Sequence, residues 1–160
     1  MPLSPGSPLP ETAIQIKHAD GIDSVGLAEW ANGRRVVLFL VPGAFTPTCS
    51  AKHLPGFIQH AEVIRAKGVA EIGCLSVNDA HVMHAWGAAT GASGKITMLA
   101  DPLAEATTAL GVSLFSTPVL GNNRASRAAL IADKGLITHA YQEEPGAFGV
   151  SSAEHILEQL

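Results

Sequence analysis

The chain has 160 residues, a length that suits one folded domain with a sizeable core. Apolar residues make up 47% of the chain, which excludes an intrinsically disordered protein, and no apolar run approaches the roughly 18 residues of a membrane span. The net charge is −4 with both signs interspersed, so no basic block indicates nucleic acid or an anionic membrane as a partner.

The cysteines and the N-terminal composition bear on the compartment. Cys49 and Cys74 lie too far apart in the sequence to form a C-x-x-C redox pair, and two cysteines do not make a disulfide scaffold. The N-terminus has no basic region followed by a long apolar stretch, so we predict no signal peptide. We therefore expect the protein to work in a reducing cytoplasm.

The first elements are short. Leu3–Pro10 is rich in proline and is expected to be an extended arm, and Thr12–Lys17 alternates apolar and polar residues as a strand does. Asp20-Gly21 favours a tight turn after that strand. Leu27–Ala31 predicts a short helix that ends near Gly33.

A strand, a loop and a helix follow one another around Cys49. Val36–Val41 is a continuous apolar run, which is typical of a strand buried on both faces. The prolines and glycine of residues 42–47 then break the chain into a tight loop. Thr46 and Thr48 are both candidate N-caps for the helix that follows, so Cys49 is expected where this helix begins.

The start of a helix favours a reactive cysteine. Its first N–H groups have no intrahelical partner and the helix dipole adds positive potential, so both stabilise a thiolate. Cysteines in such positions have pKa values of roughly 3.5–7.5, and the thiolate is the nucleophile. The alternative is a buried cysteine that serves as a small hydrophobic residue. The loop before Cys49 favours the reactive interpretation.

The middle of the chain predicts alternating helices and strands. Asn78 or Asp79 caps one of the helices, and Asp101 caps another. In chain order we expect a helix over 57–67 with a kink or restart at Pro55-Gly56, a strand over 69–77, a helix from Ala80 to about Thr90, a strand over 96–100, and a short helix that begins at Pro102 and ends before Gly111.

The C-terminal third begins with an irregular segment. Ser113–Arg127 has no clear periodicity and is predicted to be a long loop, and residues 128–142 read as a β-hairpin with a turn at 133–135. Ser151-x-x-Glu154 is a capping box that opens a final helix to Leu160. Strands that alternate with helices, followed by a hairpin and a closing helix, predict one layered α/β domain over residues 1–160 without linker or repeat.

The loop before Cys49 also resembles a known family. Residues 42–50, PGAFTPTCS, resemble the active-site loop of peroxiredoxins, with the P-x-x-x-T-x-x-C core at Pro42, Thr46 and Cys49. Together with residues 52–57, KHLPGF, this sequence is similar to the type II (atypical) branch, in particular to its plant and bacterial, glutaredoxin-dependent members. The resemblance implies a thioredoxin-like fold with N-terminal additions, in which helices flank a central mixed β-sheet.

Two further stretches support the resemblance. Residues 76–79, SVND, and the helix after them resemble type II peroxiredoxins, and Asp101 with residues 109–112, ALGV, sits where the family carries a D…ALG(V/L) pattern. The glycine and phenylalanine usual inside that second pattern are absent here, so we expect its helix to differ in detail.

The resemblance implies a thiol-dependent peroxidase that reduces hydrogen peroxide and organic hydroperoxides in antioxidant defence and redox homeostasis. Cys49 would be the peroxidatic nucleophile, which becomes a sulfenic acid. Thr46 would hydrogen-bond thiolate and peroxide, or else serve only as a helix cap. Pro42 would shield the thiolate from water, a role compatible with ending the strand before it.

The resemblance also supplies a cation. The family's active-site arginine lies in an R-x-x-R segment, which matches Arg124 and Arg127 here, except that Ala128 replaces the usual aromatic residue. Arg127 is the preferred candidate, because a fixed guanidinium stabilises a thiolate and binds peroxide oxygen. The alternative is a solvated hairpin arginine.

Cys74 has two interpretations. Its apolar neighbours favour an inert buried thiol, and the alternative is a resolving cysteine that condenses with oxidised Cys49. Ser151-Ser152 stands in the region where the animal type II branch has its resolving cysteine. The reductant is therefore expected to be an external thiol, glutathione with glutaredoxin or else thioredoxin. Two functional alternatives are a peroxide sensor and a thioredoxin-like binding module without efficient turnover.

The histidines, and the absence of cofactor motifs, bear on ligands. His81-x-x-His84 could hold two metal ligands, but a solvated helix face is favoured because no matching ligand pair is evident. His53 either approaches the thiolate or lies at the surface. We expect neither metal nor cofactor.

The apolar loop residues Phe45 and Leu114-Phe115 predict a homodimer joined near the active sites.

Overall fold

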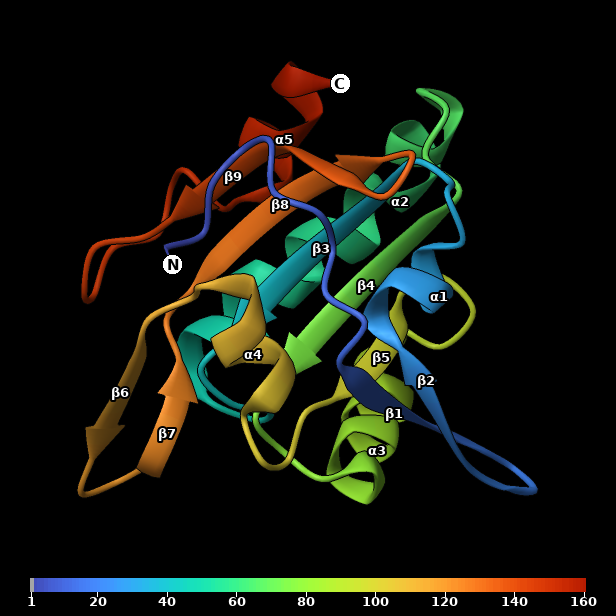
Figure 1. The fold of residues 1–160 in the computed structure, drawn as a ribbon. Coiled ribbons are helices and arrows are strands. Elements are labelled where there is room, and N and C mark those ends of the chain that lie inside the picture. The colour runs from blue at the N-terminus through green and yellow to red at the C-terminus, as the bar shows by residue number, and fades with distance from the viewer. Residues whose placement is uncertain (1) are drawn as a thin grey trace.

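A computed structural model describes residues 2–160, which form a layered α/β arrangement (Figure 1). The main sheet has seven strands in the order β2-β1-β5-β4-β3-β8-β9, and β6 and β7 form a separate pair. β3 pairs parallel with β4 and antiparallel with β8, so the sheet is mixed. The strands are β1 (Ala13–His18), β2 (Gly21–Gly26), β3 (Val36–Val41), β4 (Glu71–Ser76), β5 (Thr97–Ala100), β6 (Leu114–Thr117), β7 (Gly121–Ala125), β8 (Ala128–Asp133) and β9 (Leu136–Gln142).

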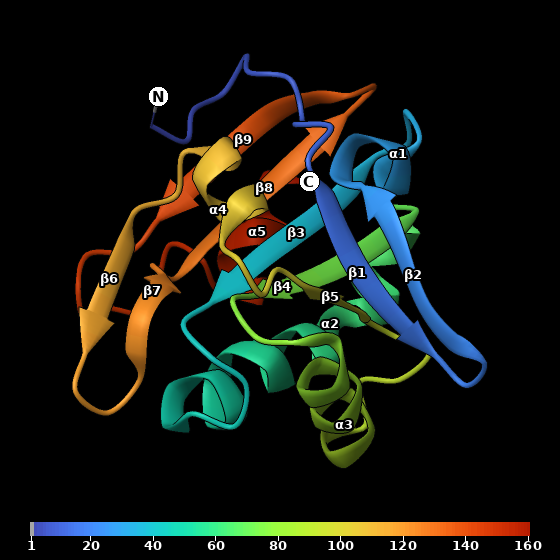
Figure 2. The same ribbon diagram turned by 60° about the horizontal axis from the view of Figure 1, so that its bottom comes forward.

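The helices cover both faces of the sheet (Figure 2). They are α1 (Leu27–Ala31), η1 (Cys49–His53), α2 (Leu54–Ala66), α3 (Ala80–Thr90), α4 (Glu105–Leu110) and α5 (Ala153–Gln159). None of the helices within residues 2–160 is both long and apolar enough to cross a membrane.

Strand β3 lies at the centre of the core. All six of its residues are buried, as the continuous apolar run predicts. Because side chains alternate along a strand, Phe39 and its odd-numbered neighbours pack with α2, α3 and α5, whereas Leu38 and Leu40 pack with α1 and α4. The two clusters together hold the sheet between its helices.

Several predicted elements are confirmed. Helix α1, strand β3 and helix α3 have the predicted bounds, and β8 and β9 form the predicted hairpin. Asp79 caps α3, because its carboxylate accepts a hydrogen bond from the N–H of Val82. The turn between β1 and β2 lies where Asp20-Gly21 predicts it.

The predicted long loop over Ser113–Arg127 is wrong. Most of this segment forms the antiparallel hairpin β6–β7. Its side chains are mostly exposed or half-buried on both faces, so the segment lacks the apolar alternation from which a strand is recognised. At the turn, Gly121 adopts a φ of 82°, which the absence of a side chain permits.

Two predicted helix starts are displaced. The helix expected from Pro102 begins at Glu105, because residues 102–103 form a turn. Asp101 still supports it: its buried carboxylate accepts hydrogen bonds from the N–H groups of Ala106 and Thr107 and from the Thr107 hydroxyl. The last helix begins at Ala153 with Ser152 as its N-cap, so the predicted capping box at Ser151 is wrong by one residue.

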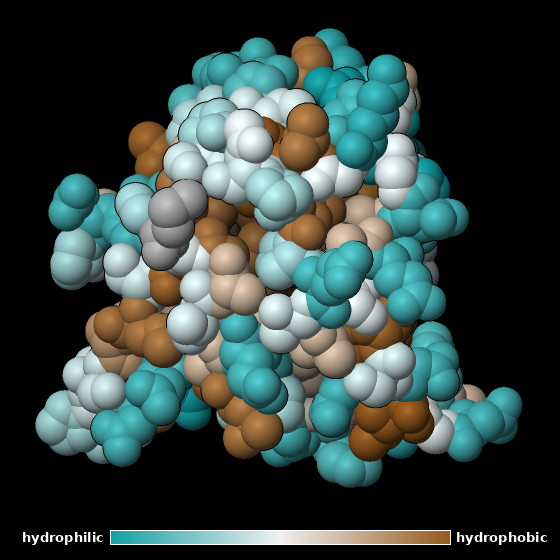
Figure 3. Space-filling view, viewed as in Figure 1, coloured by the Kyte–Doolittle hydropathy of each residue, from teal (hydrophilic) through white to brown (hydrophobic). Residues whose placement is uncertain are grey.

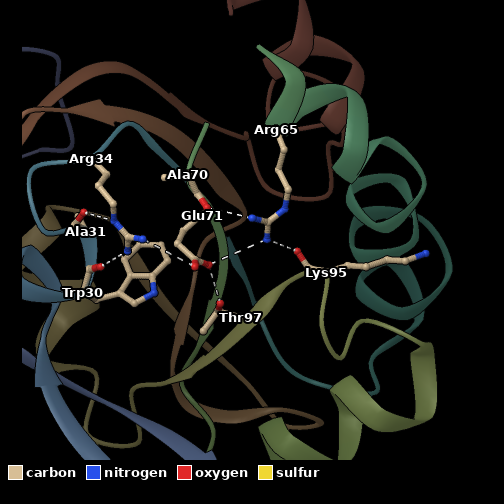
Figure 4. Close-up of polar contacts among 8 residues, drawn as sticks. All are labelled: Trp30, Ala31, Arg34, Arg65, Ala70, Glu71, Lys95 and Thr97. Carbon is tan, nitrogen blue, oxygen red and sulfur yellow. Dashed lines mark hydrogen bonds and ion pairs between the residues drawn. The ribbon is translucent and has the colours of Figure 1, made fainter. Parts of the chain in front are cut away.

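A polar network fastens the amino end of β4 (Figure 4). Glu71 lies 3.9 Å from Arg34 and 4.0 Å from Arg65, and it accepts a hydrogen bond from the Thr97 hydroxyl. Arg65 also donates to the carbonyl oxygens of Ala70 and Lys95. Arg34 donates to the carbonyl oxygens of Trp30 and Ala31 in α1. The network thus joins α1, α2 and β5 to β4, at the end of the parallel strands opposite Cys49.

Asp101→Ala is expected to lower the free energy of unfolding by about 3 kcal/mol, because three buried donors lose their acceptor. Asp79→Ala is the matched control: it removes one exposed cap bond and should lower the same quantity by about 1 kcal/mol. Urea denaturation measures both. Equal losses in the two variants would show that the Asp101 bonds do not add stability beyond an ordinary cap.

Candidate active site

Cys49 lies in the first turn of the helix that follows β3. The helix begins at Pro47, and its first hydrogen bond runs from the N–H of Ser50 to the carbonyl of Thr46. The Thr46 hydroxyl does not cap the helix but donates to the carbonyl of Gly43 at 2.7 Å, and Thr48 makes no side-chain cap bond. Cys49 is completely buried, so its sulfur lies beneath the loop rather than at the surface.

The helix widens directly after Cys49. Residues Cys49–His53 form the π-helical segment η1, in which the N–H of Leu54 bonds to the carbonyl of Cys49. Pro55 has no N–H and cannot continue the α-helical bonding pattern, which accounts for an irregular turn at this place. The kink or restart predicted at Pro55-Gly56 is therefore a π segment just before it.

Two neighbouring elements hold the loop and the first helical turn. The side-chain oxygen of Asn78 accepts hydrogen bonds from the N–H of Ala44 and from the Ser76 hydroxyl. The indole N–H of Trp86 donates to the Ser50 hydroxyl at 3.0 Å. The segment that carries Cys49 is thus fastened to the end of β4 and to α3.

Arg127 provides the cation next to Cys49. Its Nη2 donates to the Cys49 sulfur at 3.3 Å, and its Nη1 donates to His53 Nδ1 at 3.0 Å. The guanidinium also lies over the ring of Phe148, 5.9 Å from its centroid. Arg124 instead donates to the carbonyls of Leu120 and Val77. The structure therefore brings Arg127, and not Arg124, to the thiol.

His53 is a site residue whose role the sequence did not reveal. It is completely buried, so the surface interpretation is wrong, and it approaches the thiol through Arg127. Its Nε2–H donates to the carbonyl of Ser151 at 2.9 Å. Burial, followed by the charge of Arg127, lowers the pKa of His53 to about 3. The ring is therefore neutral near pH 7, with Nδ1 as the acceptor for Arg127. Its spacing four residues after Cys49 was the available signal.

Glu143 is a second residue that sequence reasoning missed. It is only 7% exposed, and its Oε2 accepts hydrogen bonds from the N–H of Gly149 and from both the N–H and the hydroxyl of Ser151. Burial alone would raise the pKa of Glu143, but these bonds and one from the Val150 N–H lower it. The carboxylate is therefore ionised and holds the segment after β9 in place.

Cys74 lies inside the sheet. It sits on β4 opposite Phe39 of β3 and is completely buried in the same apolar cluster as Cys49. Burial, with a smaller contribution from nearby Cys49, raises the pKa of the Cys74 thiol well above its usual range. Both cysteines are free. Cys74 is thus a protonated thiol held by a strand.

A cavity of about 630 Å³ opens beside this arrangement. The 42–48 loop, the β6–β7 hairpin and the segment after β9 supply its walls, which include Pro42, Thr46, Phe115, Val119, Leu120 and Arg127. A small molecule in this cavity meets apolar side chains, Thr46 and Arg127, whose guanidinium contacts Cys49. A nucleophilic sulfur, a fixed cation and a hydroxyl can together attack and polarise a small electrophile.

The comparisons with known proteins agree with this chemistry. The profile of the family described as Redoxin matches residues 4–157. The chloroplastic peroxiredoxin-2E-2 of Oryza sativa subsp. japonica is 47% identical over 163 residues, covering 99% of this chain and 72% of that protein. Peroxiredoxin-2B of Arabidopsis thaliana is 42% identical, and the match covers 99% of each chain. The crystal structure of reduced Prx3 from Vibrio vulnificus in complex with hydrogen peroxide superposes with a TM-score of 0.93 at 45% identity and covers 98% of each chain.

These findings confirm the thioredoxin-like α/β fold, a central mixed sheet flanked by helices, that the resemblance implied. They also confirm the family that the loop at residues 42–50 indicated, since relatives above 40% identity span nearly the whole chain. The chain belongs to the redoxin family and, within it, to the type II peroxiredoxins, and it is a thiol-dependent peroxidase.

Proposed function

We propose that Cys49 is the peroxidatic nucleophile and that Arg127, Thr46 and Pro42 complete its site. The observation that carries this proposal is the 3.3 Å hydrogen bond from the Arg127 guanidinium to the buried Cys49 sulfur. A buried thiolate is costly unless a partner offsets its charge, and Arg127 is that partner. Thr46 and Pro42 line the cavity beside Arg127. We expect peroxide to approach the Cys49 sulfur from this cavity.

The reaction begins with attack of the Cys49 thiolate on the terminal oxygen of a hydroperoxide. A sulfur–oxygen bond forms and the oxygen–oxygen bond breaks, so Cys49 becomes a sulfenic acid. The other oxygen leaves as alkoxide, or as hydroxide when the substrate is hydrogen peroxide, and takes a proton to give alcohol or water. Arg127 would stabilise charge on the oxygens during this step. The Thr46 hydroxyl donates its proton to the Gly43 carbonyl, so its oxygen can accept a hydrogen bond from the O–H of the hydroperoxide.

The substrates proposed are hydrogen peroxide and small organic hydroperoxides. The cavity admits an organic chain because Phe115, Val119 and Leu120 supply apolar contacts on one side. The similar Vibrio vulnificus protein has been crystallised with hydrogen peroxide, which supports that substrate for this chain as well. Removal of such peroxides is antioxidant defence, and it contributes to cell redox homeostasis.

The reductant proposed is an external thiol, either glutathione with glutaredoxin or thioredoxin. The first thiol condenses with the sulfenic acid to give a mixed disulfide and water, and a second thiol then releases the Cys49 thiolate. Two observations favour this route over Cys74. Cys74 is a raised-pKa, protonated thiol, and strand β4 restrains it between two neighbouring strands. Reducing conditions in the cytoplasm would supply such thiols, and we propose that location.

The protein is also proposed to be a homodimer. Exposed apolar residues gather on the 42–48 loop and the β6–β7 hairpin, where Phe45 is 56%, Leu114 38% and Val119 90% exposed. Apolar side chains show at the surface over β6 (Figure 3). A second copy would remove these side chains from water, which is favourable at roughly 25 cal/mol per Å² of apolar surface.

Cys49→Ser is expected to abolish peroxide turnover, because serine has no thiolate to oxidise, whereas Cys74→Ser should retain it. Peroxide consumption with dithiothreitol, with glutathione plus glutaredoxin and with thioredoxin measures turnover and identifies the reductant. Oxidation of one equivalent without turnover in all three assays would instead favour a peroxide sensor. Mass spectrometry should detect a mixed disulfide on Cys49 when glutathione is present. A stoichiometric Cys49–Cys74 bridge within one turnover, with activity lost in Cys74→Ser, would contradict the external route.

Arg127→Ala is expected to raise the pH at which alkylation of Cys49 is half-maximal by roughly one to two units, because a charge-assisted hydrogen bond to the thiolate is lost. Sulfenic acid formation should slow by about tenfold or more. Iodoacetamide labelling against pH and stopped-flow oxidation measure these effects. Arg124→Ala is the matched control and should shift the labelling profile less. An unchanged profile in Arg127→Ala would remove this arginine from the mechanism.

Phe45→Glu together with Leu114→Glu is expected to give a monomer, because a charge at the apolar surface opposes its burial. The unaltered chain should sediment as a dimer at micromolar concentration. Val63→Glu serves as control, since Val63 is 48% exposed but lies on α2, outside that surface, and should leave the dimer intact. A monomeric unaltered chain would contradict the proposal.

A further inference from the structure

The position of the Arg127 guanidinium depends on two rings. Its Nη1 donates to His53 Nδ1, and its charge lies over the ring of Phe148. The His53 and Phe148 rings also contact each other edge to face, with centroids 5.2 Å apart. Movement of either ring would therefore displace the nitrogen that contacts Cys49.

Both rings depend in turn on one irregular segment. Phe148 belongs to it, and the Ser151 carbonyl in it accepts the His53 Nε2–H. Residues 143–152 contain no helix or strand that would fix their course. The orientation and tautomer of His53 are consequently determined by a loop whose own position needs an explanation.

Glu143 supplies that explanation. Its backbone N–H bonds to the carbonyl of Arg127, and its Oε2 accepts three hydrogen bonds, from the Gly149 N–H at 2.6 Å and from the N–H and hydroxyl of Ser151 at 2.9 and 2.7 Å. One buried carboxylate oxygen therefore links the start of the segment to its end. Bonds to an ionised acceptor are about twice as strong as those between neutral groups.

We propose that Glu143 is a positioning residue for peroxide reduction, acting through Ser151 and His53 on the Arg127 guanidinium and so on the Cys49 thiolate. Glu143 also lines the cavity, but in this role it acts on the sulfur only through these contacts. The inference rests on the proposed role of Arg127, and it assigns to the segment after β9 the function of setting the distance between guanidinium and sulfur.

The sign of the expected effect separates positioning from simple electrostatics. A negative charge near Cys49 opposes thiolate formation, so removal of the Glu143 charge alone would lower the pH at which Cys49 alkylation is half-maximal. Loss of positioning acts in the opposite direction, because a displaced guanidinium stabilises the thiolate less. A rise in the half-maximal pH of a Glu143 variant would therefore indicate a displaced guanidinium, not the loss of the Glu143 charge.

The test compares alkylation profiles and sulfenic acid formation in four variants. Glu143→Ala should raise the half-maximal pH by about one unit and slow oxidation by hydrogen peroxide about tenfold. Glu143→Gln keeps an acceptor oxygen, so it should raise the half-maximal pH less than Glu143→Ala does. Ser151→Ala removes one of the three bonds and should give a smaller upward shift. Glu158→Gln removes an exposed carboxylate on α5, outside the residues that line the cavity, and should leave the profile unchanged.

Three results decide the matter. The positioning role is supported if the half-maximal pH of Cys49 alkylation rises in Ser151→Ala and rises further in Glu143→Ala. It is also supported if the shift in the double variant of Glu143→Gln and His53→Asn differs from the sum of the two single shifts. A downward or unchanged profile in folded Glu143→Gln and Ser151→Ala overturns it. Circular dichroism and thermal unfolding confirm the fold, and if Glu143→Ala does not fold, the other two variants decide. Arg127→Ala, measured in parallel, distinguishes the two failures: if it shifts the profile while the Glu143 variants do not, only the present inference fails.

Discussion

The active site depends on one contact, the hydrogen bond between a guanidinium and a buried sulfur. Cys49 is completely buried, and an anion there is stable only if a fixed positive charge replaces the water it has lost. Arg127 supplies that charge at 3.3 Å. Arginine side chains are protonated at all working pH values, so this contact does not depend on the ionisation state of the cation. The contact requires only that the guanidinium be held in the right position, and the surrounding structure holds it there.

The register of the sheet creates that geometry. Leu40, next to the end of β3, pairs with Ala128 at the start of β8, and Ala128 pairs with Gln142 at the end of β9. The loop that leads to Cys49, the residue before β8 and the segment after β9 therefore leave the sheet at the same edge. Arg127 and Glu143 each lie one residue beyond this row, so three segments distant in sequence meet over a single sulfur.

The sequence predicted those parts of the site that local patterns encode. Cys49, Thr46 and Pro42 lie in one loop, and Arg127 directly precedes a recognisable strand. No local pattern indicates the role of His53, because its partners, Ser151 and Arg127, are 98 and 74 residues away. Glu143 bonds to residues nearby in the sequence, Gly149 and Ser151, but this segment has no helix or strand whose periodicity would indicate those contacts. The β6–β7 hairpin was missed for a different reason: strands exposed on both faces carry no apolar alternation. Long-range polar contacts and exposed strands are thus the features that periodicity does not reveal.

The neutral state of His53 connects the site to the stability of the fold. A neutral acceptor leaves the full charge of Arg127 to the sulfur, whereas a carboxylate in the same place would compete with the thiolate for it. Since burial and Arg127 lower the pKa of His53 to about 3, while an unfolded histidine titrates near 6.5, the unfolded state binds more protons between these values. Folding stability from this group is complete above about pH 6.5 and falls as the pH decreases toward 3. The buried, neutral His53 leaves the Arg127 charge to interact with Cys49, and its burial also makes the fold less stable in acid.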